Sequence, residues 1–322
     1  MYSKKFNYFH GIMFHHFHDN KLHKKGQGSL NKKNLLKIIN FIGRKNILDA
    51  DVFYQKLLDK KLKKNEVCFS FDDGIKCQFD IALPVLNDLK IKSFFFVYSN
   101  LFTGKPDYLE VFRYFRTNYF KSINKFYKLF FTFVKDDLNI FFKKNSNEIK
   151  LKKIKFPHYS LNDIKFRMVR DTLLTKREYK SIMFKMFKIK NFNPKKYFKN
   201  LFMSKNDLKK IILQGHIVGL HSHSHPTLLE NLTFKNQLKE YKNNQKILSK
   251  ILKKKTSYFK TMSHPCGSYN EDTKKILNKL GVKLGFKQIM TLEKEKKMKK
   301  INNSNLEIAR QDHSDIMSII NK

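Results

Sequence analysis

The sequence predicts an α/β protein, a distorted (β/α) barrel of about seven strands that carries an α-helical insertion. Short apolar runs typical of buried strands alternate with amphipathic helical patterns, as expected for a parallel sheet. Several of these runs end in carboxylates, histidines or a glycine-containing loop, and active sites of parallel barrels lie at such strand ends. A purely helical pattern interrupts the alternation in the middle third of the chain.

The first third of the sequence supplies three predicted strands. Residues 11–18 form an apolar run with a polar end, whereas 67–72 and 93–98 are apolar runs typical of strands buried on both faces. A helix is predicted over 31–42, because its apolar residues recur at three- and four-residue steps and a glycine follows. Residues 84–89 begin with proline, which is favoured in the first turn of a helix.

Residues 105–202 differ in character and are predicted to form a helical insertion. Aromatic and aliphatic residues recur at helical spacing over 112–133, which predicts one long amphipathic helix. Thr175-Lys-Arg-Glu178 is a capping box, so another helix should begin there. Such stripes pack a core far more often than they bind a cofactor. We therefore expect the barrel to comprise residues 1–104 and 203–322.

The alternation of strands and helices resumes after the insertion. A helix capped by Ser204 and ended by Gly215 comes first, followed by a strand over 217–221 that ends in histidine. A helix over 232–252 and another that ends at Leu280 separate the last strands. These strands are predicted at 258–262, 283–286 and 306–310.

Composition limits the class of protein. The 322 residues are 41% hydrophobic and 14% aromatic, which is enough for a sizeable core. No uncharged apolar run of about 18 residues occurs, so no membrane-spanning helix is expected. The first residues lack the apolar core of a signal peptide, which makes the cytoplasm the expected location. Three scattered cysteines form no disulfide framework.

The formal net charge is +40, from 67 Lys and Arg against 27 Asp and Glu. Basic proteins often bind nucleic acids, but these lysines are spread along the whole chain and form no tail or patch. We therefore expect a solvated lysine surface and no specific nucleic-acid partner. Such a surface would favour peripheral contact with anionic membranes or acidic glycans.

Two adjacent carboxylates and a glycine, Asp72-Asp73-Gly74, end the predicted strand at 67–72. They place two anionic oxygen donors at the edge of the sheet. The glycine permits a tight turn where a side chain would crowd a ligand. Because Asp-Gly is also a common turn dipeptide, a metal site is indicated only if other ligands complete it.

A histidine cluster, His221-Ser-His-Ser-His225, follows another predicted strand. Neutral imidazole nitrogens are common metal ligands. His221 and His225 are four residues apart, so one helical turn would place them on the same side and direct His223 away. Two histidines and one carboxylate make an open site with room for water and substrate.

A third segment, Ser263-His-Pro-Cys-Gly267, lies at a further strand end. Pro265 and Gly267 flank Cys266 and fix a loop whose Cys266 N–H could serve as an oxyanion donor. An ordinary strand-to-helix turn would contain the same residue types. The conjunction of all three segments at strand ends is what indicates an active site.

These segments resemble the motifs of the polysaccharide deacetylases, a large family of carbohydrate esterases. Ser70-Phe-Asp-Asp-Gly74 resembles the T/S-F-D-D-G motif, and His221-Ser-His-Ser-His225 matches H-S/T-x-x-H. His264-Pro-Cys-Gly-Ser-Tyr269 resembles the third motif in a variant that lacks arginine. Phe14-His15 resembles the early Tyr/Phe-His strand of many members. The resemblance covers residues 8–100 and 203–322 and leaves the insertion outside.

The resemblance implies a distorted (β/α) barrel that removes acetyl groups from sugars with one divalent metal, Zn²⁺ by preference. Asp73, His221 and His225 would hold the metal, and Asp72 would be the general base for the attacking water. A bound divalent cation lowers the pKa of water to about 7, so a carboxylate of ordinary basicity can accept its proton. The metal and the Cys266 N–H would share the charge of the oxyanion.

The chain departs from the family pattern at two points. The arginine that often steadies the catalytic aspartate would fall at Ser263, and Arg310 is our candidate to replace it. The histidine that protonates the leaving amine has no clear counterpart. His313 is the first candidate, and His15 and His18 are others. Each of these residues could equally have no catalytic role.

These inferences predict a carbohydrate deacetylase that acts on an acetylated sugar, oligosaccharide or sugar nucleotide, N-acetyl by preference, in a surface-polysaccharide or lipopolysaccharide precursor. Two alternatives stay open. A metallohydrolase of the amidohydrolase or phosphoesterase type would use His221 and His223 as ligands. A catalytically impaired homologue would act as a carbohydrate-binding or scaffold protein. Nothing in the sequence indicates the oligomeric state.

Overall fold

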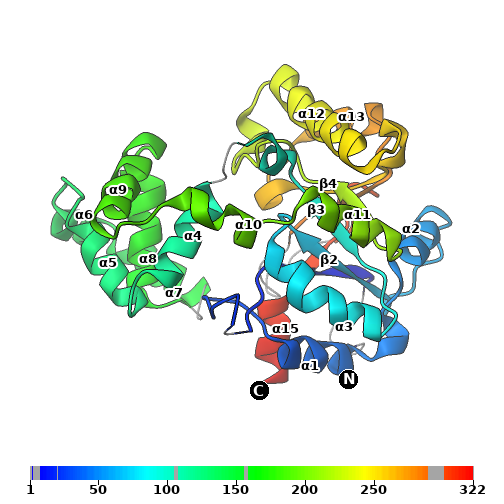
Figure 1. Cartoon of the computed structure of the whole chain (residues 1–322), viewed down its shortest axis with the longest axis horizontal. Coiled ribbons are helices and arrows are strands. Elements are labelled where there is room, and N and C mark those ends of the chain that lie inside the picture. Colours follow the sequence, from blue (N-terminus) through cyan, green and yellow to red (C-terminus); the bar gives the residue numbers. More distant parts are fainter. Residues whose placement is uncertain are drawn as a thin grey trace. The chain divides into compact units, whose positions relative to one another are not determined.

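The structure is a computed structural model, and it describes residues 2, 8–19, 21–104, 108–155, 159–288 and 301–321. The chain forms two compact units, which are coloured along the sequence in Figure 1. The first comprises Met1–Asp107 and Lys199–Lys322, and the second comprises Tyr108–Phe198. The second unit lies within residues 105–202, the range predicted for a helical insertion. No helix in the described ranges is long and apolar enough to cross a membrane.

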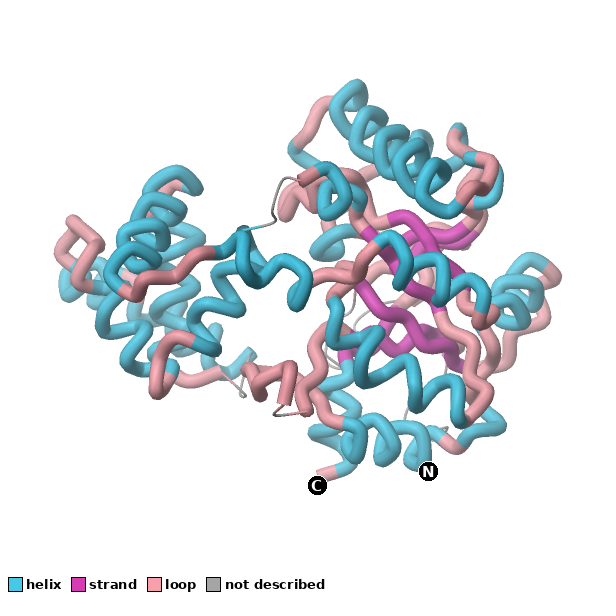
Figure 2. Tube along the Cα trace, in the orientation of Figure 1, coloured by secondary structure: helices cyan, strands magenta, loops and turns pink. Residues whose placement is uncertain are grey.

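A seven-stranded sheet with all neighbouring strands parallel forms the centre of the first unit (Figure 2). The strand order is β6-β5-β4-β3-β2-β1-β7. Every residue of β2 and β3 is buried, as their continuous apolar sequences predict. The strands are β1 (His10–Phe14), β2 (Val67–Asp72), β3 (Phe94–Val97), β4 (Ile217–Leu220), β5 (Thr261–Ser263), β6 (Leu284–Phe286) and β7 (Arg310–Asp312).

The residues just before β7 bring the two edges of the sheet together. The Ile308 N–H donates to the Gly285 carbonyl of β6 at 2.9 Å, and the Lys287 N–H donates to the Ile308 carbonyl at 2.9 Å. From Arg310 onward the same segment pairs with β1. Gly285 permits this approach, because a Cβ there would lie 2.7 Å from the Leu306 carbonyl oxygen. The predicted (β/α) barrel of seven strands is confirmed, in a nearly closed form.

Side-chain caps fix the start of several barrel helices. Asn31, Ser204, Thr233 and Asn270 each accept a hydrogen bond from a backbone N–H in the first turn of the helix that follows. The buried faces of these helices are part of the apolar core around the sheet. The helices are α1 (Lys32–Ile42), α2 (Ala50–Leu58), α3 (Leu83–Asp88), α11 (Lys205–Leu213), α12 (Phe234–Leu252), α13 (Glu271–Lys279) and α15 (His313–Ile320).

Aromatic side chains pack the core of the second unit. The ring centroids of Phe130 and Phe166 are 4.9 Å apart, and those of Phe115 and Phe187 are 4.7 Å apart. The aromatic stripe of the insertion therefore serves packing. Its helices are α4 (Tyr108–Asn118), α5 (Ile123–Phe131), α6 (Leu138–Lys144), α7 (Ser146–Lys155), α8 (Leu161–Met168) and α9 (Lys176–Ile189), and α10 (Phe198–Leu201) follows.

Three details of the predicted elements are wrong. The single helix over 112–133 is two helices, because Ser122 turns the chain and caps α5. Helix α2 was not predicted, since only three of its nine residues are buried. The last strand begins at Arg310, because residues 305–308 pair with β6 before the chain reaches β1.

Candidate active site

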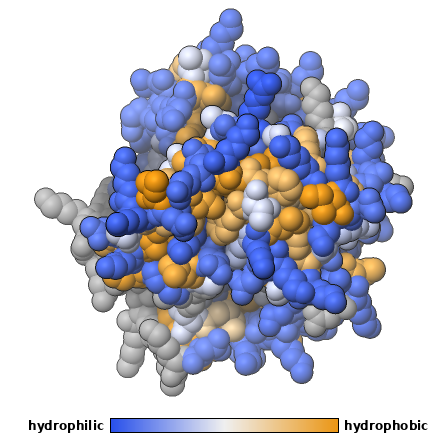
Figure 3. Space-filling view, turned by 90° about the vertical axis from the view of Figure 1, so that its left-hand side faces the viewer, coloured by the Kyte–Doolittle hydropathy of each residue, from blue (hydrophilic) through white to orange (hydrophobic). Residues whose placement is uncertain are grey.

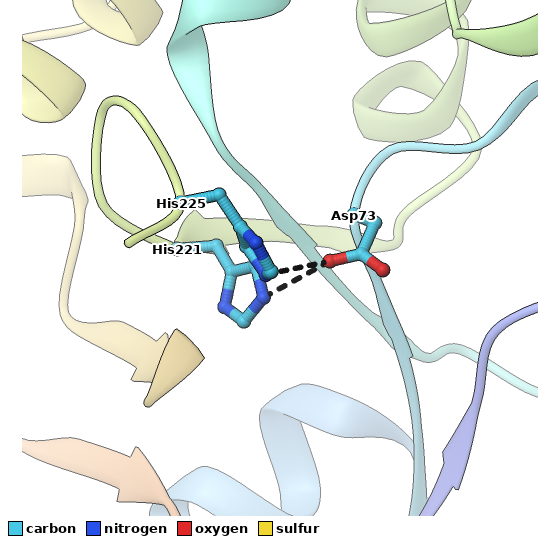
Figure 4. Close-up of side chains that lie close together, drawn as sticks. All are labelled: Asp73, His221 and His225. Atoms are coloured by element: carbon cyan, nitrogen blue, oxygen red, sulfur yellow. Dashed lines mark ion pairs between the residues drawn. The ribbon is translucent and has the colours of Figure 1, made fainter. Parts of the chain in front are cut away.

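The carboxylate of Asp73 faces two imidazoles at the carboxyl end of the sheet (Figure 4). Its Oδ1 lies 3.2 Å from Nε2 of His221 and 3.2 Å from Nε2 of His225. One donor atom from each residue lies within 4.8 Å of the others. His221 follows β4 directly, and Asp73 follows β2. The structure therefore brings together the three side chains considered as metal ligands.

The third histidine of the cluster is directed elsewhere. Nδ1 of His223 lies 2.9 Å from the Ser99 hydroxyl oxygen. The carboxylate of Glu240 accepts the N–H groups of His223 and Ser224, at 2.9 and 2.7 Å, and so fixes the turn between the other two histidines. This turn directs His223 away from Asp73, so its geometry does not suit a metal site with His221 and His223 as the ligand pair.

Left-handed backbone conformations concentrate at this site. Eight non-glycine residues in the described part of the chain have positive φ, and four of them are Asp73 (77°), Ser222 (62°), His225 (54°) and Cys266 (53°). Such conformations are costly for residues with a Cβ and persist where surrounding contacts hold them. Two of them, Asp73 and His225, face each other with Oδ1 and Nε2 3.2 Å apart.

Hydrogen bonding fixes the tautomer of His221. Its Nδ1 lies 2.9 Å from the Ser263 carbonyl oxygen, which can only accept, so Nδ1 carries the hydrogen. In the neutral ring, Nε2 then presents a lone pair to Asp73 Oδ1, a buried acceptor that receives no well-aligned hydrogen bond from the described residues. Two acceptors at 3.2 Å require a proton or a cation between them. These residues therefore fit a divalent metal held by two histidines and one carboxylate.

The same neighbours act on the acidity of Asp73. Burial alone would raise the pKa of its carboxyl, but the charge of His225 and the two close imidazoles hold that pKa well below its ordinary value. Asp73 is therefore an anion at neutral pH. An anionic carboxylate is the state that a metal ligand requires.

Arg310 holds the neighbouring carboxylate, Asp72. Nη1 and Nη2 donate to separate carboxylate oxygens, each at 2.7 Å, and the side chains are 1% and 3% exposed. The Ser263 hydroxyl also donates to Asp72, at 3.2 Å. Burial would raise the pKa of Asp72, but the guanidinium outweighs it and the pKa lies below its ordinary value. Asp72 is thus a buried carboxylate that is available as a base.

The Arg310 side chain reaches Asp72 through the interior of the barrel. In the sheet Arg310 pairs with Gly11, which pairs with Cys68, four residues before Asp72. The long side chain of Arg310 spans the distance along the strands between the level of Cys68 and that of Asp72. Gly11 leaves room for it, because a Cβ there would lie 3.0 Å from the Arg310 Cγ. The guanidinium of Arg310 comes from β7, whereas the arginine of the family motif would stand on β5, at the position that Ser263 occupies.

Among the three histidines considered as proton donors, His15 lies nearest the carboxylates. Its Nε2 is 4.0 Å from Asp73 Oδ2, and its side chain is 26% exposed. His18 instead places Nδ1 2.8 Å from the Ser29 hydroxyl, and burial lowers its pKa. His18 has no ion pair or hydrogen bond with Asp72 or Asp73 in the described structure.

The first candidate, His313, is not directed into the site. It begins α15, and its two ring nitrogens lie 3.2 Å from the Met13 carbonyl oxygen and 2.8 Å from the Gly28 carbonyl oxygen. The ring also stacks on Phe14. With both nitrogens against backbone acceptors, this side chain holds loops together and does not deliver a proton to a substrate.

Two residues of the site carried no recognisable signal in the sequence. Gln78, fully buried, donates from Nε2 to the Asp72 carbonyl at 2.6 Å and to the His15 carbonyl at 2.9 Å. It therefore ties together the backbones of Asp72, the candidate base, and of His15, the proton-donor candidate. Asp312 precedes His313; burial would raise its pKa, but the charges of His313 and His15 lower it. Only the fold places these side chains beside the motifs.

The third motif forms a tight turn after β5. Pro265–Gly267 is a 3₁₀ turn with Cys266 exposed and left-handed. The ring of His264 is buried, donates from Nε2 to the Leu306 carbonyl at 2.8 Å and stacks on Tyr269 at 4.1 Å. Since the turn follows Ser263, its backbone lies at the mouth that contains Asp72 and His221.

Comparison with known proteins agrees with these motifs. Residues 172–285 match the family model described as polysaccharide deacetylase, a range that includes the histidine cluster and the third motif. No curated protein matches the chain. The resemblance to the polysaccharide deacetylases is thereby confirmed.

Several solved structures share the fold over almost their whole length. The Streptococcus pyogenes deacetylase PplD in complex with acetate is 14% identical with a TM-score of 0.56, and the match covers 97% of both chains. IcaB from Ammonifex degensii is 13% identical with a TM-score of 0.57, over 98% of this chain and 96% of that one. A de-N-acetylase from Aggregatibacter actinomycetemcomitans is 11% identical with a TM-score of 0.54, over 97% and 99%.

Proposed function

We propose that this protein, which has the fold of the polysaccharide deacetylases, is a metal-dependent hydrolase that removes an acetyl group from a sugar. The preferred substrate is an N-acetylated sugar, oligosaccharide or sugar nucleotide of a surface polysaccharide or lipopolysaccharide precursor. One observation carries the proposal. A cation site made by Asp73, His221 and His225 lies next to Asp72, a carboxylate kept anionic by Arg310.

A divalent cation held by these ligands, Zn²⁺ by preference, would polarise the acetyl carbonyl and lower the pKa of water. Asp72 would accept a proton as water attacks the carbonyl carbon, because Arg310 and Ser263 orient its carboxylate. The Cys266 N–H at the mouth would donate to the oxyanion. With these roles, a base and an oxyanion donor would act on the same acetyl group.

Breaking the carbon–nitrogen bond requires a proton for the leaving amine. We assign this role to His15, which faces Asp73 and is partly open to solvent. The products would be acetate and a free amine.

The decisive experiment measures acetate release and metal content together. Zn²⁺-loaded protein should release acetate from a panel of N-acetylated and O-acetylated sugars, and Asp72→Asn should abolish release while it retains metal. Asp88→Asn is the matched control, because Asp88 is exposed on α3 and should not affect either measurement. Retained activity in Asp72→Asn would refute the mechanism.

A different result would favour the binding or scaffold homologue. If the wild-type protein holds stoichiometric metal but releases acetate from no sugar tested, the catalytic proposal fails while the metal site stands. Binding of an acetylated oligosaccharide under those conditions would then support a carbohydrate-binding role.

A further inference from the structure

Helix α7 has apolar residues on both of its sides. Ile149 is buried and packs with Ile164 and Met168 of α8. Leu151 and Ile154, which are 66% and 77% exposed, lie roughly 200° and 140° around the helix from Ile149. A helix that packs one face on a core is normally polar on the other. The second apolar face is therefore left without a partner inside the described unit.

Helix α6 adds to this surface. None of its residues is fully buried, and Ile140 is 67% exposed. Figure 3 looks at the side of the helical unit and shows hydrophobic surface among hydrophilic side chains. We name the exposed part of α6 and α7 the α6–α7 surface. Its exposed apolar residues are Ile140, Leu151 and Ile154.

Lysines accompany these apolar side chains. Residues 138–155 contain six lysines and one acidic residue, Glu148, which pairs with Lys152 at 3.2 Å. Lys143 and Lys144 at the end of α6 and Lys150 in α7 are exposed. The two aspartates before α6 add negative charge only at its start, where Asp137 caps the helix. The α6–α7 surface is thus apolar and strongly basic together.

The combination of apolar and basic side chains on the α6–α7 surface favours one kind of partner over others. A second copy would bring one basic surface against another, since Tyr108–Phe198 contains 23 Lys and Arg against 7 Asp and Glu. A soluble polyanion would satisfy the lysines but leave the isoleucines and leucine in water. An anionic lipid bilayer offers negative head groups for lysines and an acyl boundary for apolar side chains.

We propose that the α6–α7 surface docks the protein on anionic lipid membranes, with Leu151 and Ile154 inserted at the head-group boundary and Lys143, Lys144 and Lys150 on the head groups. The proposal does not depend on the deacetylase activity. It gives the helical unit a role in holding the protein where lipid-linked or membrane-proximal glycans occur.

The chain has no tryptophan, which permits a direct test. The full-length variant Leu151→Trp should show a blue-shifted emission and quenching by brominated lipid when mixed with vesicles of phosphatidylcholine containing 30% phosphatidylserine. Vesicles of phosphatidylcholine alone should give neither change. Leu213→Trp is the control, because Leu213 is 85% exposed on α11 of the barrel unit and should stay in water on both vesicles. The same response from both tryptophans would overturn the proposal.

Co-sedimentation with the same vesicles measures how much the apolar side chains and the lysines each contribute to membrane binding. Leu151→Ser combined with Ile154→Ser should weaken binding at least tenfold, and Lys143→Gln, Lys144→Gln and Lys150→Gln about fivefold each. Circular dichroism should show unchanged thermal unfolding, because all five side chains are exposed. Binding that survives the double serine variant refutes the membrane assignment. So does a concentration-dependent dimer, without lipid, that the same variant abolishes, since it would assign the surface to a second copy.

Discussion

Replacing Arg310 with methionine tests the centre of the proposed site, because it removes the charge while filling much of the same volume. The guanidinium makes two hydrogen bonds of 2.7 Å to Asp72, and both side chains are almost fully buried. Removing one partner of a buried pair costs about 3–5 kcal/mol, since the other charge stays desolvated. We expect Arg310→Met to lower the free energy of unfolding at pH 7 by this amount.

The same change should alter the acidity of Asp72. With Arg310 present, the pKa of Asp72 lies below its ordinary value of 3.8 despite burial. Without Arg310, burial is largely unopposed and the pKa should rise, so the base becomes protonated at higher pH. The acidic limb of kcat/KM for acetate release should therefore move to higher pH. Each unit of that shift corresponds to about 1.4 kcal/mol.

Urea unfolding and the pH profile of acetate release provide the assay. Arg177→Met is the control, because Arg177 is exposed on α9 and should change neither measurement. In the double variant with Asp72→Asn, the destabilisation should be smaller than the sum of the single effects, since asparagine needs no cation. A loss of less than about 1 kcal/mol in Arg310→Met, or strict additivity, would refute the reasoning.

Three further results are expected. His225→Ala should lower bound metal in elemental analysis at least tenfold and His223→Ala should not, whereas equal losses would favour the ligand pair of another metallohydrolase. Burial lowers the pKa of His216 from 6.5 to about 4. The contribution of His216 to the free energy of unfolding is therefore full above pH 6.5 and falls with decreasing pH by about 1.4 kcal/mol per unit. His216→Gln should flatten this pH dependence, and an unchanged slope would contradict the reasoning. Gly285→Ala should cost about 3 kcal/mol because its Cβ meets backbone at 2.7 Å, against about 1 kcal/mol for Gly104→Ala, where only the positive φ opposes the change; similar losses would argue against this account of barrel closure.

Local patterns in the sequence were sufficient for the barrel. Buried parallel strands are continuous apolar runs, so β2 is predicted to the residue and β3 and β4 within one residue at each end. The capping box at Thr175 and the helix cap at Ser204 are confirmed, because a cap is a local hydrogen-bond pattern. The break between α4 and α5 was not predictable from the apolar stripe, since both helices use the same spacing and only Ser122 marks the turn.

The three candidate metal ligands could be predicted because they follow the carboxyl ends of two parallel strands, in segments with distinctive residue types. Asp73 follows β2, and His221 and His225 lie in one turn after β4. The remaining contacts of the site depend on distances that no local pattern encodes. Gln78 looks like any residue of a helix, and its link to His15 exists only because β1 and β2 are neighbours.

The pairing of β1 with β7, from the two ends of the chain, explains why the arginine of the family motif can be absent. A buried carboxylate needs a cation, but the cation can come from any strand whose side chains enter the barrel. Here β7 lies beside β1, so Arg310 reaches Asp72 from the end of the chain, and the charge of Asp312 interacts with His15 from its beginning. Gly11 on β1 provides the space through which the arginine reaches Asp72. A cation beside Asp72, the proposed base, is therefore retained although its position in the sequence has changed, which is why Ser263 at the motif position does not argue against the proposed catalysis.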